Sequence, residues 1–239
     1  MTLPLAILSI AACLGCNRAP GRPAPNSAVV PPDQIMDFQT LYGQNCSGCH
    51  GAEGRGGAAL ALRDPVFLAI ADERVIRRVA SQGVPGTPMP AFAQSAGGML
   101  TGQQIEVIVR GIRSWAKPEE LRALSPPPYS DPAAGNPQRG EAAYANFCAS
   151  CHGSEGRGGK ASSIVDGAYL SLVSDQDLRT IVIAGRPELG APDWRNDVPG
   201  QPMSAQNVSD VVAWLAQKRP GRWVQTANVI TAQPAGGTP

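Results

Sequence analysis

The sequence contains one short pattern twice, as Cys46-Ser47-Gly48-Cys49-His50 and as Cys148-Ala149-Ser150-Cys151-His152. Cys-x-x-Cys-His is the attachment pattern of c-type haem. Two thiols with two residues between them can each form a thioether to one haem vinyl group, and the histidine that follows is then placed to ligate the iron. The chain has only 2 histidines, and each lies in one of these stretches. We therefore expect two covalently attached haem c groups, held by Cys46, Cys49 and His50 and by Cys148, Cys151 and His152.

Other sites built from cysteine explain the two stretches less well. A structural zinc site needs four Cys or His ligands, and each stretch offers three. A redox-active Cys-x-x-Cys pair would not need a following histidine twice. A plain disulfide pair stays open as an alternative, but both copies continue in the same way, with Gly-x-Glu-Gly-Arg-Gly-Gly after the histidine.

Composition limits the function classes. The net charge is +1 and 16% of the residues are charged, so the charge does not indicate a nucleic-acid-binding protein. The chain holds 27 glycines and 23 prolines, which is typical of a protein rich in turns. Its aromatic residues are few (4 Trp, 4 Tyr and 4 Phe) for two small domains. A buried haem in each domain would supply the missing apolar area.

The N-terminal residues 1–16 are apolar and end in small residues, which is typical of a signal peptide and too short for a membrane span. They contain no Lys or Arg. Ile10-Ala11-Ala12-Cys13 resembles a bacterial lipobox, so we expect lipidation of Cys13, with Cys16 as a poorer candidate. An ordinary secretory signal is the alternative. Either one predicts a protein on the periplasmic side of the bacterial envelope, and the lipobox adds an anchor to a membrane.

The rest of the chain reads as a tether, two repeats and a tail. Residues 17–32 are rich in proline, 118–135 form a linker by composition, and 220–239 read as a disordered tail. The repeats, 33–117 and 136–219, superpose with a shift of 102 residues up to Gly83 and Gly185. Beyond that point we expect a 12-residue insertion within 186–197 and a shift of 114. Helical spacing of apolar residues dominates both repeats, so the predicted fold is all-α, with each repeat wrapped around a haem.

Methionine is the expected second axial ligand, because no third histidine exists. Met89 and Met203 each end a Val-Pro-Gly-x-Pro-Met segment, and we expect them to ligate the first and the second iron. The alternative is that they fill gaps in the core. Met99 is the reserve for the first haem.

These motifs resemble the dihaem class I cytochromes c of bacteria, over about residues 33–218. The resemblance implies two fused cytochrome c domains and an electron carrier rather than an enzyme. It also implies that a proline carbonyl orients each proximal histidine. Pro65 fits that place in the first repeat, whereas the second has Gly167, so we expect the two haems to differ in potential. The family packs its first helix on its last through a small residue beside an aromatic one. Gly140 with Trp214 fits, but the first repeat has Phe38 opposite Trp115, so its helices must pack differently.

We expect electron transfer between membrane complexes or soluble carriers, with redox proteins and the membrane, not nucleic acid, as partners. One alternative is the cytochrome subunit of a larger respiratory or photosynthetic complex. A less favoured alternative is a dihaem redox enzyme, such as a peroxidase or a sulfur-compound dehydrogenase, which would need an open haem. Residues 33–117 carry eight basic and seven acidic side chains, and residues 136–219 carry eight and nine. Long-range steering of a partner should therefore be weak.

Overall fold

The computed structural model describes residues 30–220. The signal segment with Cys13 and Cys16, most of the tether and nearly all of the expected tail lie outside this range. The chain divides into two compact units, Met1–Ile35 and Met36–Pro239. The described part of the first unit holds the short 3-10 helix η2 (Pro32–Gln34), and both haem-motif repeats belong to the second unit.

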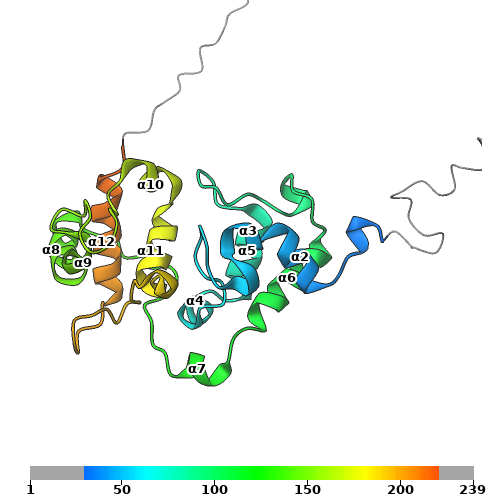
Figure 1. The fold of residues 1–239 in the computed structure, drawn as a ribbon, viewed down its shortest axis with the longest axis horizontal. Helices are drawn as coiled ribbons and strands as arrows, with labels where there is room; N and C mark the ends of the chain where they lie inside the picture. Colours follow the sequence, from blue (N-terminus) through cyan, green and yellow to red (C-terminus); the bar gives the residue numbers. More distant parts are fainter. Residues whose placement is uncertain (1–29, 221–239) are drawn as a thin grey trace, which may run out of the picture. The chain divides into compact units, whose positions relative to one another are not determined.

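The described residues form helices, 3-10 turns and two isolated β-bridges, with no strand among them, so the predicted all-α fold is confirmed (Figure 1). The elements of the first repeat are α2 (Phe38–Asn45), α3 (Ser47–His50), η3 (Ala52–Gly54), α4 (Pro65–Ile70), α5 (Glu73–Gln82), η4 (Gln94–Ala96) and α6 (Gly102–Arg113). Those of the second are α8 (Pro137–Phe147), α9 (Ala149–His152), α10 (Gly167–Leu172), α11 (Asp175–Ala184), η5 (Pro187–Leu189) and α12 (Ala205–Gln217). Helix α7 (Pro118–Arg122) lies between the repeats.

Each long helix begins at a side chain that accepts a hydrogen bond from the exposed backbone N–H groups of its first turn. The spacing Ser174-x-x-Asp177 predicts a capping box, and these two residues form it at the start of α11. The pair Asn136-Pro137 predicts a helix start, and Asn136 caps α8 with Pro137 at its first position. The remaining capping residues are Asp37 for α2, Asp72 for α5, Thr101 for α6 and Ser204 for α12.

The core of each repeat lies where its last helix packs against its first helix and its middle helix. In the second repeat α12 packs against α8 on one side and α11 on the other (Figure 1). Gly140 makes this approach possible, since a Cβ there would lie 2.0 Å from the carbonyl oxygen of Asp210 and 2.8 Å from Trp214 Cβ. The expected contact between Gly140 and Trp214 is therefore confirmed. The largest fully buried side chains include Leu41, Tyr42, Ile105, Ile108 and Val109 in the first repeat and Tyr144, Leu170, Ile183, Val208 and Val211 in the second.

The first repeat packs its helix pair differently, as its sequence predicts. Phe38 lies edge-on to Trp115, with ring centroids 5.4 Å apart. The glycine that makes room for Phe38 is Gly111 on the last helix, where a Cβ would lie 2.0 Å from the Phe38 ring. The first repeat thus has its aromatic residue on the first helix and its glycine on the last, whereas the second repeat has the glycine on the first helix and the aromatic residue on the last.

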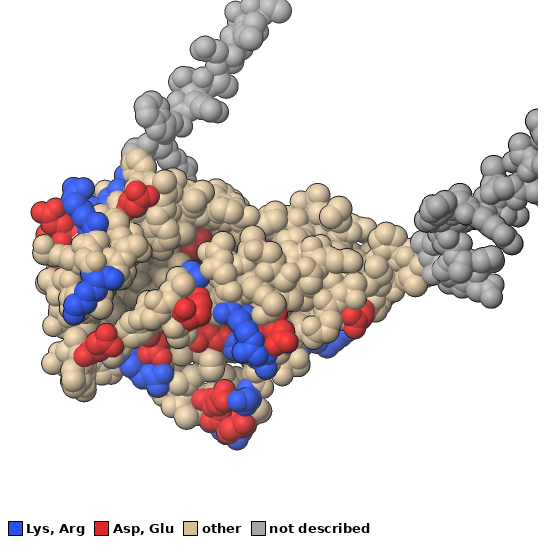
Figure 2. Space-filling model, in the orientation of Figure 1, with Lys and Arg blue, Asp and Glu red and all other residues tan. Residues whose placement is uncertain are grey.

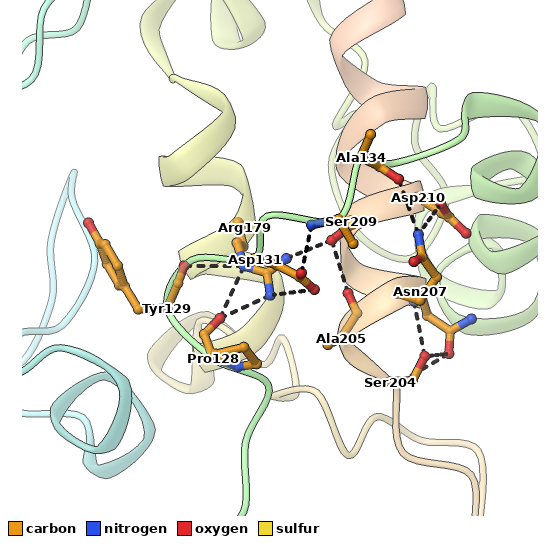
Figure 3. Close-up of polar contacts among 12 residues, drawn as sticks. Pro128, Tyr129, Asp131, Ala134, Arg179, Ser204, Ala205, Asn207, Ser209 and Asp210 are labelled. Carbon is orange, nitrogen blue, oxygen red and sulfur yellow. Dashed lines mark hydrogen bonds and ion pairs between the residues drawn. The ribbon is translucent and has the colours of Figure 1, made fainter.

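Arg179 holds the second half of the segment between the repeats against the second repeat (Figure 3). This arginine is only 6% exposed. Its guanidinium donates hydrogen bonds to the carbonyl oxygens of Pro128, at 2.9 Å, and Tyr129, at 3.1 Å. It also donates to Ser209 Oγ at 2.9 Å and lies 3.8 Å from the Asp131 carboxylate. A buried guanidinium is tolerated because its donors are satisfied. These contacts hold residues 128–131 against α11 and α12.

Candidate haem-binding sites

Each Cys-x-x-Cys-His stretch is a single helical turn directly after the first helix of its repeat. The amide of His50 donates to the carbonyl oxygen of Cys46 at 3.0 Å, and His152 repeats this bond to Cys148 at the same distance. Residues three and four apart lie on one face of a helix. The two thiols and the histidine of each stretch therefore share one face, as attachment to a single macrocycle requires.

The imidazole of each motif is oriented by a backbone carbonyl. His50 Nδ1 lies 2.8 Å from the carbonyl oxygen of Leu60, and His152 Nδ1 lies 2.7 Å from that of Ser162. A carbonyl oxygen can only accept, so Nδ1 carries the proton and the lone pair lies on Nε2, the nitrogen left for iron. Burial lowers the pKa of His50, which favours this neutral form.

The expected roles of Pro65 and Gly167 in orienting the histidines are wrong. Both residues open short helices, at the first positions of α4 and α10. The loop after each motif folds back onto the histidine within ten residues. The carbonyl that faces the ring is therefore that of Leu60 or Ser162, not that of Pro65 or Gly167. Since this bond is the same in both repeats, it gives no reason for the haem potentials to differ.

The donor set fits haem c. Cys46, Cys49, Cys148 and Cys151 are free thiols, so no disulfide occupies either motif. Burial raises the pKa of Cys46 to about 11 and that of Cys148 to about 11, which keeps both protonated at neutral pH. Protonated thiols could add across the haem vinyl groups, and each histidine would hold the iron through Nε2, because its Nδ1 is bonded to a backbone carbonyl. When attached, haem c supplies one-electron redox chemistry.

The shared Gly-x-Glu-Gly-Arg-Gly-Gly segment has a steric cause. Gly51 has φ +77°, and a Cβ on it would lie 2.1 Å from the carbonyl oxygen of Gly56. In the second repeat Gly153 has φ +79°, and its Cβ would lie 2.4 Å from that of Gly158. Only glycine fits at a position that has a positive φ and that also lies in contact with another backbone segment of the same loop. This tight loop places the carbonyl that holds each histidine.

Two buried tyrosines, Tyr42 and Tyr144, support the same loops from the core. The Tyr42 hydroxyl donates to the carbonyl oxygen of Gly51 at 2.9 Å, and Tyr144 donates in the same way to Gly153. Burial raises the pKa of Tyr42 to about 12, so the phenol stays a donor at any physiological pH. The two motif arginines have no such role. Arg55 and Arg157 are 67% and 79% exposed and pair with Glu53 and Glu155.

The two methionines do not occupy equivalent places. In the first repeat the amide of Val84 donates to the carbonyl oxygen of Met89 at 3.0 Å. The matching bond in the second repeat runs from Arg186 to Ala191, also at 3.0 Å. Both pairs follow the positive-φ glycines that end α5 and α11, Gly83 and Gly185. The shift of 102 therefore continues through this loop, and Ala191 stands where the first repeat has Met89.

Met203 matches Leu100 instead. Its amide donates to the carbonyl oxygen of Trp194 at 2.8 Å, just as that of Leu100 donates to Phe92 at 2.8 Å. Met203 is 5% exposed and Leu100 is 6% exposed, and each directly precedes the residue that caps the last helix.

The expected 12-residue insertion is therefore wrong. Seven residues separate Phe92 from Leu100 and eight separate Trp194 from Met203, a difference of one. The sequence contained a sign of this alignment. Three residue pairs in the loop, Pro85 with Pro187, Pro90 with Pro192 and Phe92 with Trp194, keep the shift of 102. Of the other methionines, Met99 is 81% exposed and Met36 is 40% exposed.

Comparison with known proteins identifies the family. The model of the family described as "Cytochrome C oxidase, cbb3-type, subunit III" matches residues 33–110 and again residues 135–215. Together these segments make up well over half of the chain. The chain belongs to this family. Subunit III-type domains occur twice in it, and the protein is a dihaem cytochrome c with two covalently bound haem c groups.

One curated relative is the cbb3-type cytochrome c oxidase subunit CcoP of Rubrivivax gelatinosus, which is 30% identical to this chain over 139 residues. The match covers 57% of this chain and 40% of that relative's length. Among solved structures, a chain of the reducing HAO-like protein complex of Kuenenia stuttgartiensis aligns with a TM-score of 0.41 and 17% identity. That alignment covers 80% of this chain and 100% of the other.

The family assignment confirms the predicted electron carrier with haem c. None of the helices between residues 30 and 220 is both long and apolar enough to cross a membrane.

Proposed function

We propose that the protein carries electrons to or from a membrane-bound terminal oxidase as a dihaem cytochrome c subunit or docking partner on the periplasmic side of the envelope. The observation that carries the proposal is the match of both repeats to oxidase subunit III. The similarity to an oxidase subunit of Rubrivivax gelatinosus supports it.

The first haem has the ligands of an electron carrier. We propose His50 and Met89 as its axial ligands. His50 presents Nε2, because its Nδ1–H is held by Leu60. Met89 lies in a loop closed by two hydrogen bonds. The amide of Val84 donates to the Met89 carbonyl oxygen at 3.0 Å, and the amide of Met89 donates to Thr87 Oγ1 at 3.2 Å. A ligand held by a closed loop keeps its place in both oxidation states, which favours rapid electron transfer.

Anchoring to a membrane through a lipidated Cys13 belongs to the same proposal. The lipobox-like Ile10-Ala11-Ala12-Cys13 and the proline-rich residues 17–32 support it. An anchored chain searches only the membrane surface for its partner, which raises the partner's effective concentration. Strong charge steering is then unnecessary, in line with the Lys, Arg, Asp and Glu side chains that intermingle on the face in Figure 2.

Affinity purification of the tagged protein from detergent-solubilised membranes of its own host tests the proposal. We expect the catalytic subunit of a terminal oxidase to copurify, and the isolated complex to oxidise the protein's haems when oxygen is added. Recovery of the protein without an oxidase, combined with no effect of its deletion on oxygen consumption, would overturn the proposal. The Cys13→Ala variant tests the anchor separately: it should move from the membrane to the soluble fraction while keeping both haems.

A further inference from the structure

We propose that the second haem lacks a methionine ligand, so that its iron offers a sixth position to a small neutral ligand such as carbon monoxide or nitric oxide. The inference starts from Ala191, which takes the backbone place that Met89 holds in the first repeat. It rests on haem attachment at Cys148, Cys151 and His152, and it does not depend on which complex the protein serves.

The loop around Ala191 is closed, and its residues 186–192 include no methionine, histidine or cysteine. Arg186 and Ala191 exchange two backbone hydrogen bonds, each of 3.0 Å. Between them η5 (Pro187–Leu189) forms a tight turn that ends at Gly190, with φ +82°. The loop is thus closed by the same amide-to-carbonyl bond as its counterpart in the first repeat, although its turn residues differ, and it carries a methyl group where the first repeat has the Met89 side chain. A methyl group cannot ligate iron.

Met203 is held in the core by contacts on both sides of it in the chain. Its amide is bonded to Trp194, and its neighbour Ser204 forms a capping box with Asn207 at the start of α12. Trp194 is itself only 6% exposed, and its amide donates to the carbonyl oxygen of Ile183 in α11. The buried residue in the corresponding place of the first repeat is Leu100. A methionine that replaces a core leucine is a packing residue.

No other histidine, methionine or unassigned cysteine remains for this iron. The chain has 2 histidines, and both are proximal ligands of their own motifs. Of its 5 methionines, Met203 is the only one beyond residue 99. The cysteines of the second repeat are those of its haem motif. An iron with one imidazole ligand and no second protein ligand binds π-acceptor diatomics when reduced.

Titration of the reduced holoprotein with carbon monoxide tests the proposal. We expect the wild type to bind one carbon monoxide for every two haems. The oxidised protein should show the weak far-red band of methionine-ligated haem at the intensity of one haem, together with a high-spin signal from the other. Absence of carbon monoxide binding, or a far-red band of two-haem intensity, would overturn the proposal.

Three substitutions assign the site. Ala191→Met should abolish carbon monoxide binding and double the far-red band. Met203→Leu, which places in the second repeat the residue found in the first, should leave both signals unchanged. Met89→Ala should raise the stoichiometry to two carbon monoxide molecules per chain and remove the far-red band. If Met203→Leu removes a far-red band or creates a new carbon monoxide site, Met203 is a ligand and the proposal fails, whether or not Ala191→Met folds.

Discussion

Phe38 in α2 lies so close to Gly111 in α6 that a Cβ on that glycine would be 2.0 Å from the phenyl ring. The second repeat solves the same packing problem in reverse, with Gly140 on its first helix and Trp214 on its last. One aromatic side chain and one glycine are thus needed wherever these two helices meet, whichever helix supplies each. The exchange conserves volume at the contact, which a close-packed interior requires.

Gly111→Ala should therefore destabilise the protein. The new methyl group meets an aromatic ring that is already wedged against Trp115, and overpacking of this kind costs about 1–3 kcal/mol. Chemical unfolding of the holoprotein measures the loss. The matched control is Gly102→Ala at the start of the same helix, where a Cβ would meet nothing within 4 Å. Equal stability of the two variants would contradict the packing account.

Gly51→Ala should impair attachment of the first haem. A Cβ there would lie 2.1 Å from the carbonyl oxygen of Gly56, in a loop whose path places the Leu60 carbonyl against His50. Haem staining of the denatured chain, with the pyridine haemochrome yield, should show loss toward one haem per chain. Gly48→Ala lies inside the motif itself but has open space around it, and it should keep both haems. A full haem load in Gly51→Ala would show that the loop tolerates the displacement.

The ion pair between Arg139 and Asp210 should make stability depend on pH in acid. Asp210 is 2% exposed; it accepts bonds from Arg139 at 2.8 Å and from the Asn136 amide at 2.7 Å. Burial alone would raise the pKa of Asp210, but these hydrogen bonds outweigh it and lower the pKa below its usual value. A lowered carboxyl pKa adds stability that is present above the unfolded-state pKa and is lost as the pH falls through the folded-state value.

Asp210→Asn should consequently lose about 1.5–3 kcal/mol at neutral pH, because charge-assisted hydrogen bonds become neutral ones. Its unfolding free energy should also fall less steeply than that of the wild type as the solution is acidified. Glu141→Gln is the control, since Glu141 is an exposed carboxylate on the same helix as Arg139. Parallel acid profiles for wild type and Asp210→Asn would refute the assignment.

Arg179→Lys should loosen the segment between the repeats. An ammonium group cannot reach the Pro128 and Tyr129 carbonyls and Ser209 Oγ together as the planar guanidinium does. Limited proteolysis should cut residues 124–135 several-fold faster than in the wild type, while haem content stays the same. Arg157→Lys, at a side chain that is 79% exposed, should leave the cleavage rate unchanged. Unaltered cleavage in Arg179→Lys would mean that other contacts hold the segment.

Local features of the chain could be predicted because their causes are local. A few consecutive residues decide each of the two Cys-x-x-Cys-His turns. The same holds for the helix caps at Asn136 and Ser174, whose side chains accept from the amide three residues on. Spacing along one helical turn decides which side chains share a face, and this is legible in the sequence. The Gly-Trp pairing of the second repeat was also predictable from family resemblance, whereas the compensating Gly111 was not.

The methionine assignment shows where local similarity misleads. Val84 to Met89 and Val198 to Met203 are nearly the same string, yet one lies in the loop after α5 and the other runs into the cap of α12. Which string belongs to the loop that follows the middle helix is decided by backbone bonds, from Val84 to Met89 and from Arg186 to Ala191, and a match of six residues does not contain them.

The sequence by itself determined the number of haems and the helical fold and predicted the covalent and proximal ligands, because thioether attachment and helix capping act over a few residues. Only the tertiary structure decided which carbonyls orient the histidines and which helix supplies the glycine at each crossing. It also decided between two possible alignments of the repeats, and so which residue stands in the place of Met89. Those outcomes depend on where loops close in space, and closure is set by hydrogen bonds and packing between residues distant in the chain.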